Sequence, residues 1–580
     1  MESFSFQPKL DVSLVGTGTN SQIKFTANYT CFKPFQPIQK LITKRFALKI
    51  PTAPQGDIVR KKPIHEIIFK PLDDFISRSF TNNLPLPPFI DPEIVLSGNF
   101  SRVDELPPTA CEVVEGFLPP SLDGVYIQNS PNSQFAPRGP YHLVDGDGML
   151  HSIKMSRGKA TFCSRFVRTH KYIMERDLEY SIFPNLFALF NNKLTASVVL
   201  TIIRIITCQL NPFIKGIGTA NTSLSLFGGH LFALVEYDLP YSIKLTSDGD
   251  IITIGRHDFN SSEFFMNMTA HPKIDPETGE AFAFKYFVIP PFLSFFRIDP
   301  NGRKTKEVPI FSMKGASFVH DFAVTKNFAV FPDVQIVINP LQIMRGRTIM
   351  SVDRDKVPRL GVIGRYAEDE SEMYWIDVPG FNMLHVVNAW DEDDGDRIVI
   401  VASNVLPIEH ALERMDLINF SMEKITIDAK AKKIVNRRPV SATSLDFGTI
   451  NPQYAGKKNR YIYAAAMEIM PKITGVVKID LSLLSADSSG DCTVASRMYE
   501  AGCYGSEPIF VAREPNNPGG EEDDGYLLSY VHNENTKESQ FLVMDAKSPS
   551  LEIVAAVKLP RRVPYGFHSI FVKESDLHKL

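Results

Sequence analysis

The sequence predicts an all-β fold, and a β-propeller accommodates its length best. From Gly124 onward, short apolar runs alternate with turns rich in Gly, Asp, Asn and Pro, as in GVYIQNSPNSQF and YHLVDGDGMLHSIKM. This texture continues for about 450 residues, too long for one sandwich, whereas a propeller repeats four-stranded blades around an axis. No WD-type repeat is present, so the sequence period alone does not give the number of blades.

Two stretches predict individual strand pairs. The runs YLLSYV (526–531) and FLVMDA (541–546) flank a polar turn and predict a hairpin. Within Gly315–Asp333, two apolar runs flank Thr325-Lys326-Asn327 and predict two short strands. Residues two apart share one face of a strand, so His320 is expected between the apolar side chains of Phe318 and Phe322.

Composition narrows the class of protein. The 580 residues are 44% hydrophobic and 22% charged, as in ordinary globular proteins, and the 42 phenylalanines indicate a large apolar interior. The net charge of -4, without a basic helix or zinc-knuckle spacing, argues against a nucleic-acid partner. The six cysteines form no CxxC pair, which favours a reducing compartment over a secreted disulfide framework.

The N-terminal region divides into two parts. Residues 1–55 carry seven Lys or Arg residues against Glu2 and Asp11, with frequent Ser and Thr, as an organelle transit peptide does; a disordered tail is the alternative. Residues 56–120 are expected to wrap the main body, first as short helical pieces broken at Pro71 and then as an extended, proline-rich stretch. Residues 121–580 form the expected β domain.

One segment departs from the strand texture. Residues 183–210 read FPNLFALFNNKLTASVVLTIIRIITCQL, in which a helix would gather Ser197, Thr201, Arg204 and Cys208 on one face. Valines and isoleucines occupy the rest of its surface. The apolar part is short for a membrane span, which needs ~20 residues. An amphipathic helix in one leaflet and a helix buried against the body both remain open.

Four histidines follow apolar residues at or near strand-like runs. They are His271 in NMTAHPKI, His320 in SFVHDFA, His385 in FNMLHVVNAWDE and His568 in PYGFHSIFV. Separations of 49, 65 and 183 residues exclude a local zinc finger, but suit inner strands of different blades that converge on one axis. From spacing alone, each histidine is better explained as a core residue than as a ligand. If the four do form a metal site, imidazoles would suit Zn, Cu, Ni or Fe.

These motifs, together with GDGMLHSIKM and VPYGFHSIFV, closely resemble the carotenoid cleavage dioxygenases from roughly Gly124 to Val572. The runs GSEPIFVAREPNNPGGEEDDGYLLSYVHNE and FLVMDAKSPSLEIVAAVKLPRRVPYGFH resemble the plant plastidial branch of type 4. The resemblance implies a seven-bladed propeller with one Fe(II) per chain, held by His271, His320, His385 and His568.

The resemblance also implies roles for residues around the iron. Glu236, Glu507 and Asp446 map to carboxylates that orient the imidazoles, although the family has glutamate at the last position and this chain is one methylene shorter there. Thr222 in ANTSL maps to a residue that helps orient oxygen. Asp321 follows a ligand but is expected to point to the opposite face of its strand, so it is a poor candidate for such a role.

The implied reaction is oxidative cleavage of a carotenoid or apocarotenoid double bond by dioxygen, giving two carbonyl products. The resembling branch cuts most often at 9,10 (9′,10′), to an ionone and an apocarotenal; 7,8 cleavage and 9-cis-epoxycarotenoid cleavage are alternatives on the same fold. A non-catalytic binder of apolar ligands is an alternative of another class. The implied setting is a chloroplast or chromoplast, at a plastoglobule or membrane surface contacted by Ile202, Ile203 and Ile206.

Overall fold

A computed structural model describes two units of the chain, Met1–Ile68 and Phe69–Leu580. The described residues are 12–15, 22–25, 71, 86–137, 139–190, 201, 203–206, 210–212, 214–345, 348–484, 491–514, 517 and 519–577. In the first unit, β1 (Val12–Val15) pairs antiparallel with β2 (Gln22–Phe25). The rest of the predicted transit peptide lies outside the described residues, as does the predicted helical stretch except Pro71, which is helical.

The second unit contains four separate four-stranded antiparallel sheets, in each of which the strands lie side by side in the order of the chain. The first contains β7 (Ser223–Phe227), β8 (His230–Leu234), β9 (Tyr241–Leu245) and β10 (Ile251–Arg256). The second contains β11 (Lys273–Ile274), β12 (Ala281–Tyr286), β13 (Leu293–Ile298) and β14 (Val308–Ile310). The third contains β15 (Ala323–Val324), β16 (Phe328–Asp333), β19 (Arg359–Gly364) and β20 (Tyr374–Asp377). The fourth contains β21 (Met383–Glu392), β22 (Arg397–Leu406), β23 (Asn419–Asp428) and β24 (Lys433–Pro439). A separate pair joins β17 (Ile336–Ile338) to β18 (Met350–Val352).

The remaining strands form one 14-stranded sheet. One group in it is β25 (Leu445–Thr449), β26 (Tyr461–Ile469), β27 (Lys472–Asp480) and β28 (Thr493–Met498). A second is β30 (Ile509–Ala512), β31 (Gly525–Asn533), β32 (Ser539–Asp545) and β33 (Ile553–Lys558), linked to the first through β29 (Cys503–Gly505). A third is β34 (Ser569–Lys573), β4 (Gly124–Asn132), β5 (Asp147–Ser156) and β6 (Lys159–Phe166).

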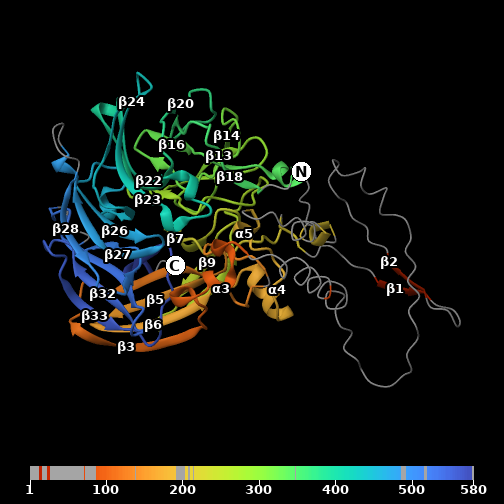
Figure 1. The fold of residues 1–580 in the computed structure, drawn as a ribbon, viewed down its shortest axis with the longest axis horizontal. Helices are drawn as coiled ribbons and strands as arrows, with labels where there is room; N and C mark the ends of the chain where they lie inside the picture. The colour runs from red at the N-terminus through yellow and green to blue at the C-terminus, as the bar shows by residue number, and fades with distance from the viewer. Residues whose placement is uncertain are drawn as a thin grey trace. The chain divides into compact units, whose positions relative to one another are not determined.

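The two ends of the second unit meet in this sheet. β3 (Leu106–Gly116) pairs with both β33 and β6, and β34 pairs with β4. In Figure 1 the orange strands β3, β5 and β6 accordingly lie beside the blue strands β32 and β33. The proline-rich stretch expected to be extended therefore supplies strand β3 in its second half. Its first half instead forms short helical turns at Pro88–Ile90, Pro92–Val95 and Gly98–Phe100.

Helices are few and short among the described residues. The α-helices are α3 (Pro92–Val95), α4 (His170–Leu178), α5 (Leu186–Phe190) and α7 (Glu574–Leu577). The 3₁₀ turns are η3 (Pro88–Ile90), η4 (Gly98–Phe100), η5 (Pro340–Arg345), η6 (Asp393–Gly395), η7 (Ile408–His410), η8 (Met415–Leu417), η9 (Pro452–Tyr454) and η10 (Leu481–Leu483). Within the described part of the chain, no helix has the length and apolar character needed to cross a membrane. The prediction of an all-β fold is confirmed.

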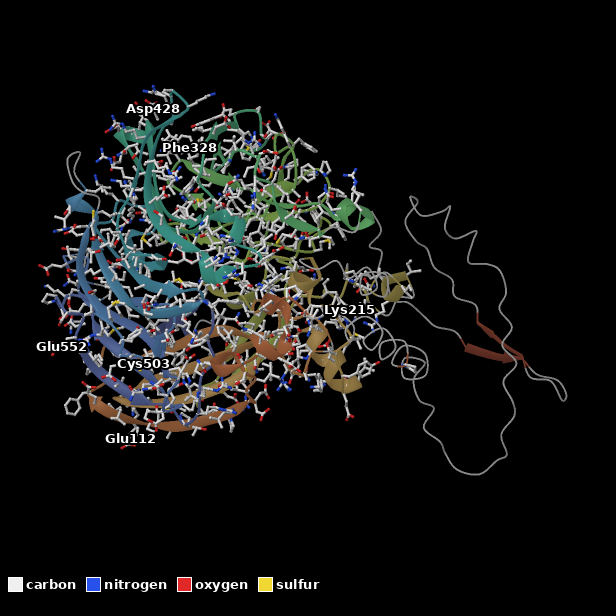
Figure 2. All side chains as sticks on the ribbon, viewed as in Figure 1. Glu112, Lys215, Phe328, Asp428, Cys503 and Glu552 are labelled. Atoms are coloured by element: carbon white, nitrogen blue, oxygen red, sulfur yellow. The ribbon has the colours of Figure 1, made fainter. Side chains whose placement is uncertain are left out.

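Phenylalanines fill the space between neighbouring sheets. Phe284 and Phe295 from the second sheet pack against Phe331 of the third sheet and Phe322 just before it, with ring centroids 5.1–6.4 Å apart. Each is fully or almost fully buried, so the abundance of phenylalanine reflects packing between sheets. Figure 2 shows Glu112 on β3 and Glu552 just before β33 at the periphery, and both are exposed.

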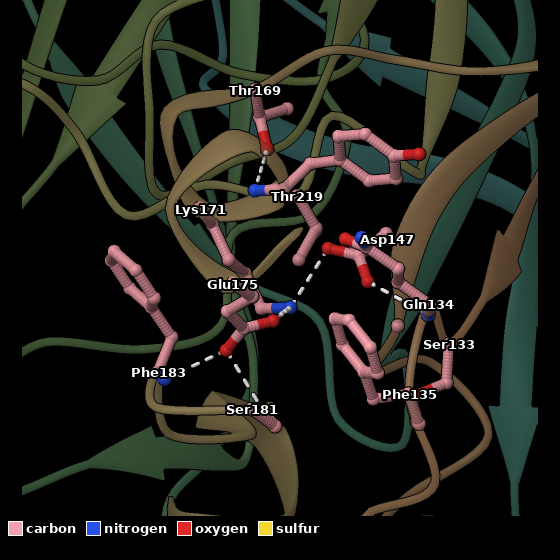
Figure 3. A network of polar contacts seen from close by, with 12 residues as sticks. Ser133, Gln134, Phe135, Asp147, Thr169, Lys171, Glu175, Ser181, Phe183 and Thr219 are labelled. Carbon is pink, nitrogen blue, oxygen red and sulfur yellow. Dashed lines mark hydrogen bonds and ion pairs between the residues drawn. The ribbon is translucent and has the colours of Figure 1, made fainter. Parts of the chain in front are cut away.

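A buried charge network fixes α4 to the sheet (Figure 3). The Lys171 ammonium lies 2.8 Å from Asp147 of β5 and 2.7 Å from Glu175, one turn along α4. Burial alone would lower the pKa of Lys171, but the two carboxylates outweigh it and raise that pKa. The second oxygen of Glu175 accepts hydrogen bonds from the backbone N–H groups of Ile182 and Phe183, at 2.8 Å each. The network therefore holds the chain where the unusual 183–210 segment begins.

The described part of that segment turns its arginine inward. Thr201 and residues 203–206 are helical, and residues 191–200, Ile202 and Cys208 lie outside the described residues. Arg204 is buried and donates a hydrogen bond to the carbonyl oxygen of Ile182. Ile203 and Ile206 are 38% and 60% exposed. The side of the segment that carries Arg204 thus faces the protein, and two isoleucines face outward.

The two predicted strand pairs have different outcomes. The 526–546 hairpin is confirmed as β31 and β32. In Gly315–Asp333 the second strand forms as β16, but the first is confined to β15, so the prediction that His320 lies within a strand was wrong. The reason is a competing partner: Ser317 bridges Val337, and the Phe318 N–H donates to the Ile336 carbonyl, which draws this stretch toward β17. Phe318 nevertheless stacks on the His320 ring, with centroids 5.5 Å apart.

Candidate metal centre

The four predicted histidines meet in space. One ring nitrogen from each of His271, His320, His385 and His568 lies within 4.8 Å of the others. His271 and His320 precede β11 and β15 by two or three residues, His385 lies in β21, and His568 directly precedes β34. Each of these is the first strand of its four-stranded group, so the repeated arrangement of strands brings together histidines up to 297 residues apart in the chain.

The histidines present their Nε2 atoms to one another. The Nε2 atom of His320 lies 3.0 Å from the Nε2 atom of His271 and 3.0 Å from that of His385. The His568 ring is placed similarly, with its centroid 4.6 Å from that of His271 and 5.0 Å from that of His385. The cluster therefore has a small centre that is surrounded by ring nitrogens.

Carboxylates lie behind three of the rings. His320 Nδ1 is 2.6 Å from Glu236 Oε1, and His568 Nδ1 is 3.0 Å from Glu507 Oε1. His385 Nδ1 is 3.0 and 2.9 Å from the two oxygens of Asp446. A carboxylate at Nδ1 keeps the proton there and leaves Nε2 with a free lone pair. The three acidic residues predicted from the sequence thus all reach the histidine rings.

Asp446 makes this contact directly despite its shorter side chain. Its strand loses register with β26 after the Asp446–Ala465 pair, and Phe447 adopts a positive φ of 49°. Such a bulge bends the strand and redirects the adjacent side chain. Gly448 is also required there, because a Cβ atom at this position would come within 2.5 Å of Val387. From this bulge Asp446 reaches His385 without an intervening group.

His385 is redirected in a similar way. β21 loses register with β22 between Met383 and Val386, which leaves His385 outside the regular ladder of Cα partners. The His385 backbone N–H instead donates to the Ser403 hydroxyl, at 3.2 Å. Phe447 packs against the rings of His385 and His568, at centroid distances of 5.2 and 5.3 Å. Neither Ser403 nor Phe447 carried a recognisable signal in the sequence.

The electrostatics favour neutral rings at two positions. Burial, aided by the neighbouring imidazoles, holds the pKa of His271 well below its usual value. Burial also lowers the pKa of His385, against the opposing effect of Asp446. At His568 burial is outweighed by Glu507, and the pKa is raised. Burial would raise the pKa of Asp446, but His385 outweighs it and lowers that pKa.

This donor set fits a metal ion. With the Nδ1 protons held by Glu236 and Asp446, the Nε2 lone pairs of His320 and His385 face each other across 3.0 Å. Two lone pairs at that distance repel unless a proton or a cation lies between them. Imidazole nitrogens are ligands for zinc, copper, nickel and iron, so donor chemistry alone does not select among these metals.

The other predicted site residues lie as follows. Thr222 directly precedes β7, the first strand of the first sheet, and its hydroxyl is 3.3 Å from Asn221 Oδ1. The isoleucines Ile203 and Ile206 belong to the 183–210 segment and are not members of the histidine cluster. Asp321 contacts none of the four rings, as expected, but its carboxylate is buried and accepts the backbone N–H of Val386 at 2.7 Å.

Comparison with known proteins identifies the family. The family model described as retinal pigment epithelial membrane protein matches residues 99–573. A relative named "Probable carotenoid cleavage dioxygenase 4, chloroplastic", from Arabidopsis thaliana, is 58% identical over 503 residues, which cover 86% of this chain and 83% of the relative. A chloroplastic 9-cis-epoxycarotenoid dioxygenase of Oryza sativa subsp. japonica is 50% identical over 511 residues, covering 87% and 79%.

A solved structure supports the same fold. The lignostilbene dioxygenase of Pseudomonas brassicacearum superimposes with a TM-score of 0.71 at 23% identity, covering 85% of this chain and all of that one. The family match includes all four histidines and the three carboxylates behind them. The chain therefore belongs to the carotenoid oxygenase family, a family of dioxygenase enzymes.

Proposed function

We propose that this protein is a non-haem Fe(II) dioxygenase that cleaves a carotenoid or apocarotenoid double bond to two carbonyl products. The observation that carries the proposal is the meeting of four imidazoles whose Nε2 atoms lie as close as 3.0 Å. Family membership supports iron as the metal, with His271, His320, His385 and His568 as its ligands. Bound there, Fe(II) would supply the activation of dioxygen that the cleavage reaction requires.

Residues around the histidines orient the imidazole rings and shield them from water. Glu236, Asp446 and Glu507 hold protons at the Nδ1 atoms and fix the ring planes, so that each Nε2 atom is available as a neutral ligand. Phe318 and Phe447 pack on the rings of His320 and His385 and limit the access of water. We propose that Thr222 helps to orient dioxygen, because its position in ANTSL matches the family motif. No protein acid or base is required, since both atoms of dioxygen end in the two carbonyl groups.

We propose further that the second unit is a seven-bladed propeller. Among the described residues, the four separate sheets and the three groups within the 14-stranded sheet give seven antiparallel sets of four strands. Pairing of β34 with β4 would close the ring with a blade made from both ends of the unit. The proposed domain organisation is a transit peptide over residues 1–55, a wrap over 56–120 and the propeller over 121–580, with the insertion at 183–210.

The carbon–carbon bond proposed for cleavage is 9,10 (9′,10′), which yields an ionone and an apocarotenal. The higher identity to the type 4 relative (58%) than to the epoxycarotenoid dioxygenase (50%) supports the type 4 branch over 9-cis-epoxycarotenoid cleavage. Within that branch, the choice of the 9,10 bond rests on the resemblance of the sequence alone. Cleavage at 7,8 is the alternative within the same branch. Apolar walls discriminate weakly between neighbouring double bonds, so regioselectivity must come from how deeply the polyene enters.

Product analysis after anaerobic reconstitution with Fe(II) tests this assignment. The substrates are β-carotene, zeaxanthin, a violaxanthin-type epoxide and an apocarotenal. Ionone with the matching apocarotenal is expected, whereas aldehydes shorter or longer by one double-bond unit would reassign the cut. A protein that binds these carotenoids but takes up no iron would be the non-catalytic binder of apolar ligands, and iron content therefore separates the two classes of function.

We propose that the protein is located in a plastid and that it acts at a membrane or plastoglobule surface there. The relatives described above are named chloroplastic, and the basic, hydroxyl-rich residues 1–55 have the composition of a transit peptide. Ile203 and Ile206 are exposed while Arg204 faces the protein, which supports insertion of this segment, with Ile202, into one leaflet. Import of a fluorescent protein fused to residues 1–55 tests the location.

Replacing Ile203 and Ile206 together with glutamate is expected to weaken binding to liposomes by at least roughly 100-fold, because two buried isoleucines together contribute about 3–6 kcal/mol. Flotation with liposomes measures the bound fraction. The control is Ile469→Glu on β26, a comparably exposed isoleucine (55%) outside the segment, which should bind like the parent. Unchanged flotation of the double variant would remove the membrane role of this segment.

Asp446→Ala is expected to weaken metal binding by roughly 10- to 100-fold, as loss of a group that orients a ligand typically does. Asp446→Asn keeps an oxygen that can accept the Nδ1 proton of His385, so its effect should be smaller. Titration of the metal-free protein with Co(II) measures both affinities. If the alanine variant bound Co(II) as tightly as the parent, Asp446 would have no role in fixing His385.

A further inference from the structure

Asp321 touches three of the four chain segments that carry the histidines. It directly follows His320 and is only 2% exposed. Its Oδ2 atom accepts the backbone N–H of Val386, the residue after His385, at 2.7 Å. Lys273, two residues after His271, places its ammonium 2.7 Å from Oδ1 and 3.0 Å from Oδ2. One carboxylate thus links the His271, His320 and His385 segments without contacting a ring.

His271 has the greatest need of such a link. The described residues provide a carboxylate at Nδ1 for His320, His385 and His568, and none for His271. The backbone of His271 is held locally, by donation of its N–H to the Thr269 hydroxyl at 3.0 Å. The Lys273–Asp321 ion pair connects its segment to the segment of His320.

His568 lies outside this link and has its own. Glu507 contacts the His568 ring through Oε1 and accepts the backbone N–H of Ser569 through Oε2, at 2.6 Å. The His568 carbonyl oxygen accepts the N–H of Asn129 at 2.9 Å. Asp321 therefore links the segments of the three histidines that belong to separate four-stranded sheets. Glu507 instead contacts His568, which precedes β34 in the group that also contains β4, β5 and β6.

We propose that Lys273 and Asp321 form a brace that sets the spacing of His271, His320 and His385, and so determines how tightly the centre binds its metal. Both are positioning residues, since neither contacts the histidine rings. This inference rests on the proposed metal centre. Displacement of one ligand by a fraction of an ångström weakens a site built on fixed imidazoles, because such sites depend on ligands held within about 0.5 Å of the productive geometry.

Different substitutions remove the Lys273–Asp321 ion pair while keeping the hydrogen bond between Asp321 and Val386. Lys273→Met keeps the length of the side chain and removes the ion pair, while the Asp321–Val386 contact remains. Lys273 is 26% exposed, so this change leaves the core intact. Asp321→Asn keeps an acceptor for the Val386 N–H and removes the charge that attracts Lys273. Lys273→Arg retains the charge and the reach to Asp321.

The test uses the full-length, metal-free protein and Co(II) as the probe. Lys273→Met and Asp321→Asn are each expected to weaken Co(II) binding roughly 10-fold or more, which is the usual effect of removing a residue that supports a metal ligand. Each substitution should also alter the visible d–d absorption of the bound ion. The double variant should be no weaker than either single variant, because both remove the same ion pair. Lys273→Arg should restore most of the affinity.

A matched control separates the brace from general stability. Lys478→Met removes another buried ion pair, with Asp523 at 2.6 Å, and should leave Co(II) affinity and absorption unchanged. If the Lys273 and Asp321 variants bind Co(II) like the parent, with the same absorption, the brace is refuted while the proposed function stands. A parent protein that binds neither Co(II) nor Fe(II) at this centre refutes both.

Discussion

His320→Ala is expected to abolish stoichiometric iron binding and to lower carotenoid cleavage by more than about 100-fold, since even the residues behind metal ligands contribute 10- to 100-fold. His320 occupies the middle of the cluster, with its Nε2 atom 3.0 Å from those of both His271 and His385. Its removal also leaves Glu236 without the ring at 2.6 Å. Iron content after reconstitution and the initial rate of cleavage measure the two effects.

The fold should survive this substitution. His320 lies outside the regular strands, so its loss disturbs no ladder of backbone hydrogen bonds. The control is His257→Ala, a half-buried histidine that packs against Phe232 and Phe259 rather than against the four clustered rings. Circular dichroism should show native β structure for both variants. Retention of one tightly bound iron by His320→Ala would show that the metal binds elsewhere.

Lys171→Met is expected to lower the free energy of unfolding by about 3–5 kcal/mol, the usual effect of removing one partner of a buried ion pair. The side chains of Asp147 and Glu175 are each only 1% exposed, and Lys171 is the cation that faces both (Figure 3). Without it, two buried carboxylates lie close together. Urea denaturation followed by circular dichroism gives the change directly.

A second ion pair on the same helix provides the control. Arg176 and Asp177 pair at 2.8 Å with both side chains at least half exposed, so Arg176→Ala should cost about 0–1 kcal/mol. Equal, small effects of the two substitutions would mean that the network does not anchor α4. Because Glu175 also holds Ile182 and Phe183, loosening by Lys171→Met should increase protease cleavage near the start of the 183–210 segment.

Local patterns predicted the strands and the ligand candidates well. The 526–546 hairpin follows from two apolar runs about a polar turn, and it formed as expected. The four histidines were found from their separate sequence motifs. They meet in space because each lies in or next to the first strand of a four-stranded group and these groups repeat along the chain. The resemblance to a known family was needed to choose among core packing, zinc and iron.

Long-range contacts account for what the sequence did not reveal. The inward turn of Arg204 depends on the Ile182 carbonyl, and the linking role of Asp321 on Val386, which lies 65 residues further along the chain. The direct reach of Asp446 depends on a bulge at Phe447 that no local pattern predicted. The early part of Gly315–Asp333 left its predicted strand because β17 offered a competing partner.

The most direct test of the account is the isotopic composition of the products formed under ¹⁸O₂ by protein reconstituted with one Fe(II) per chain. Reaction with a carotenoid should yield two carbonyl fragments, each carrying one ¹⁸O atom when back-exchange with water is trapped by rapid reduction. The metal-free protein should yield neither fragment. Iron-loaded protein that leaves the polyene intact, or products whose oxygen comes only from water, would contradict the central claim.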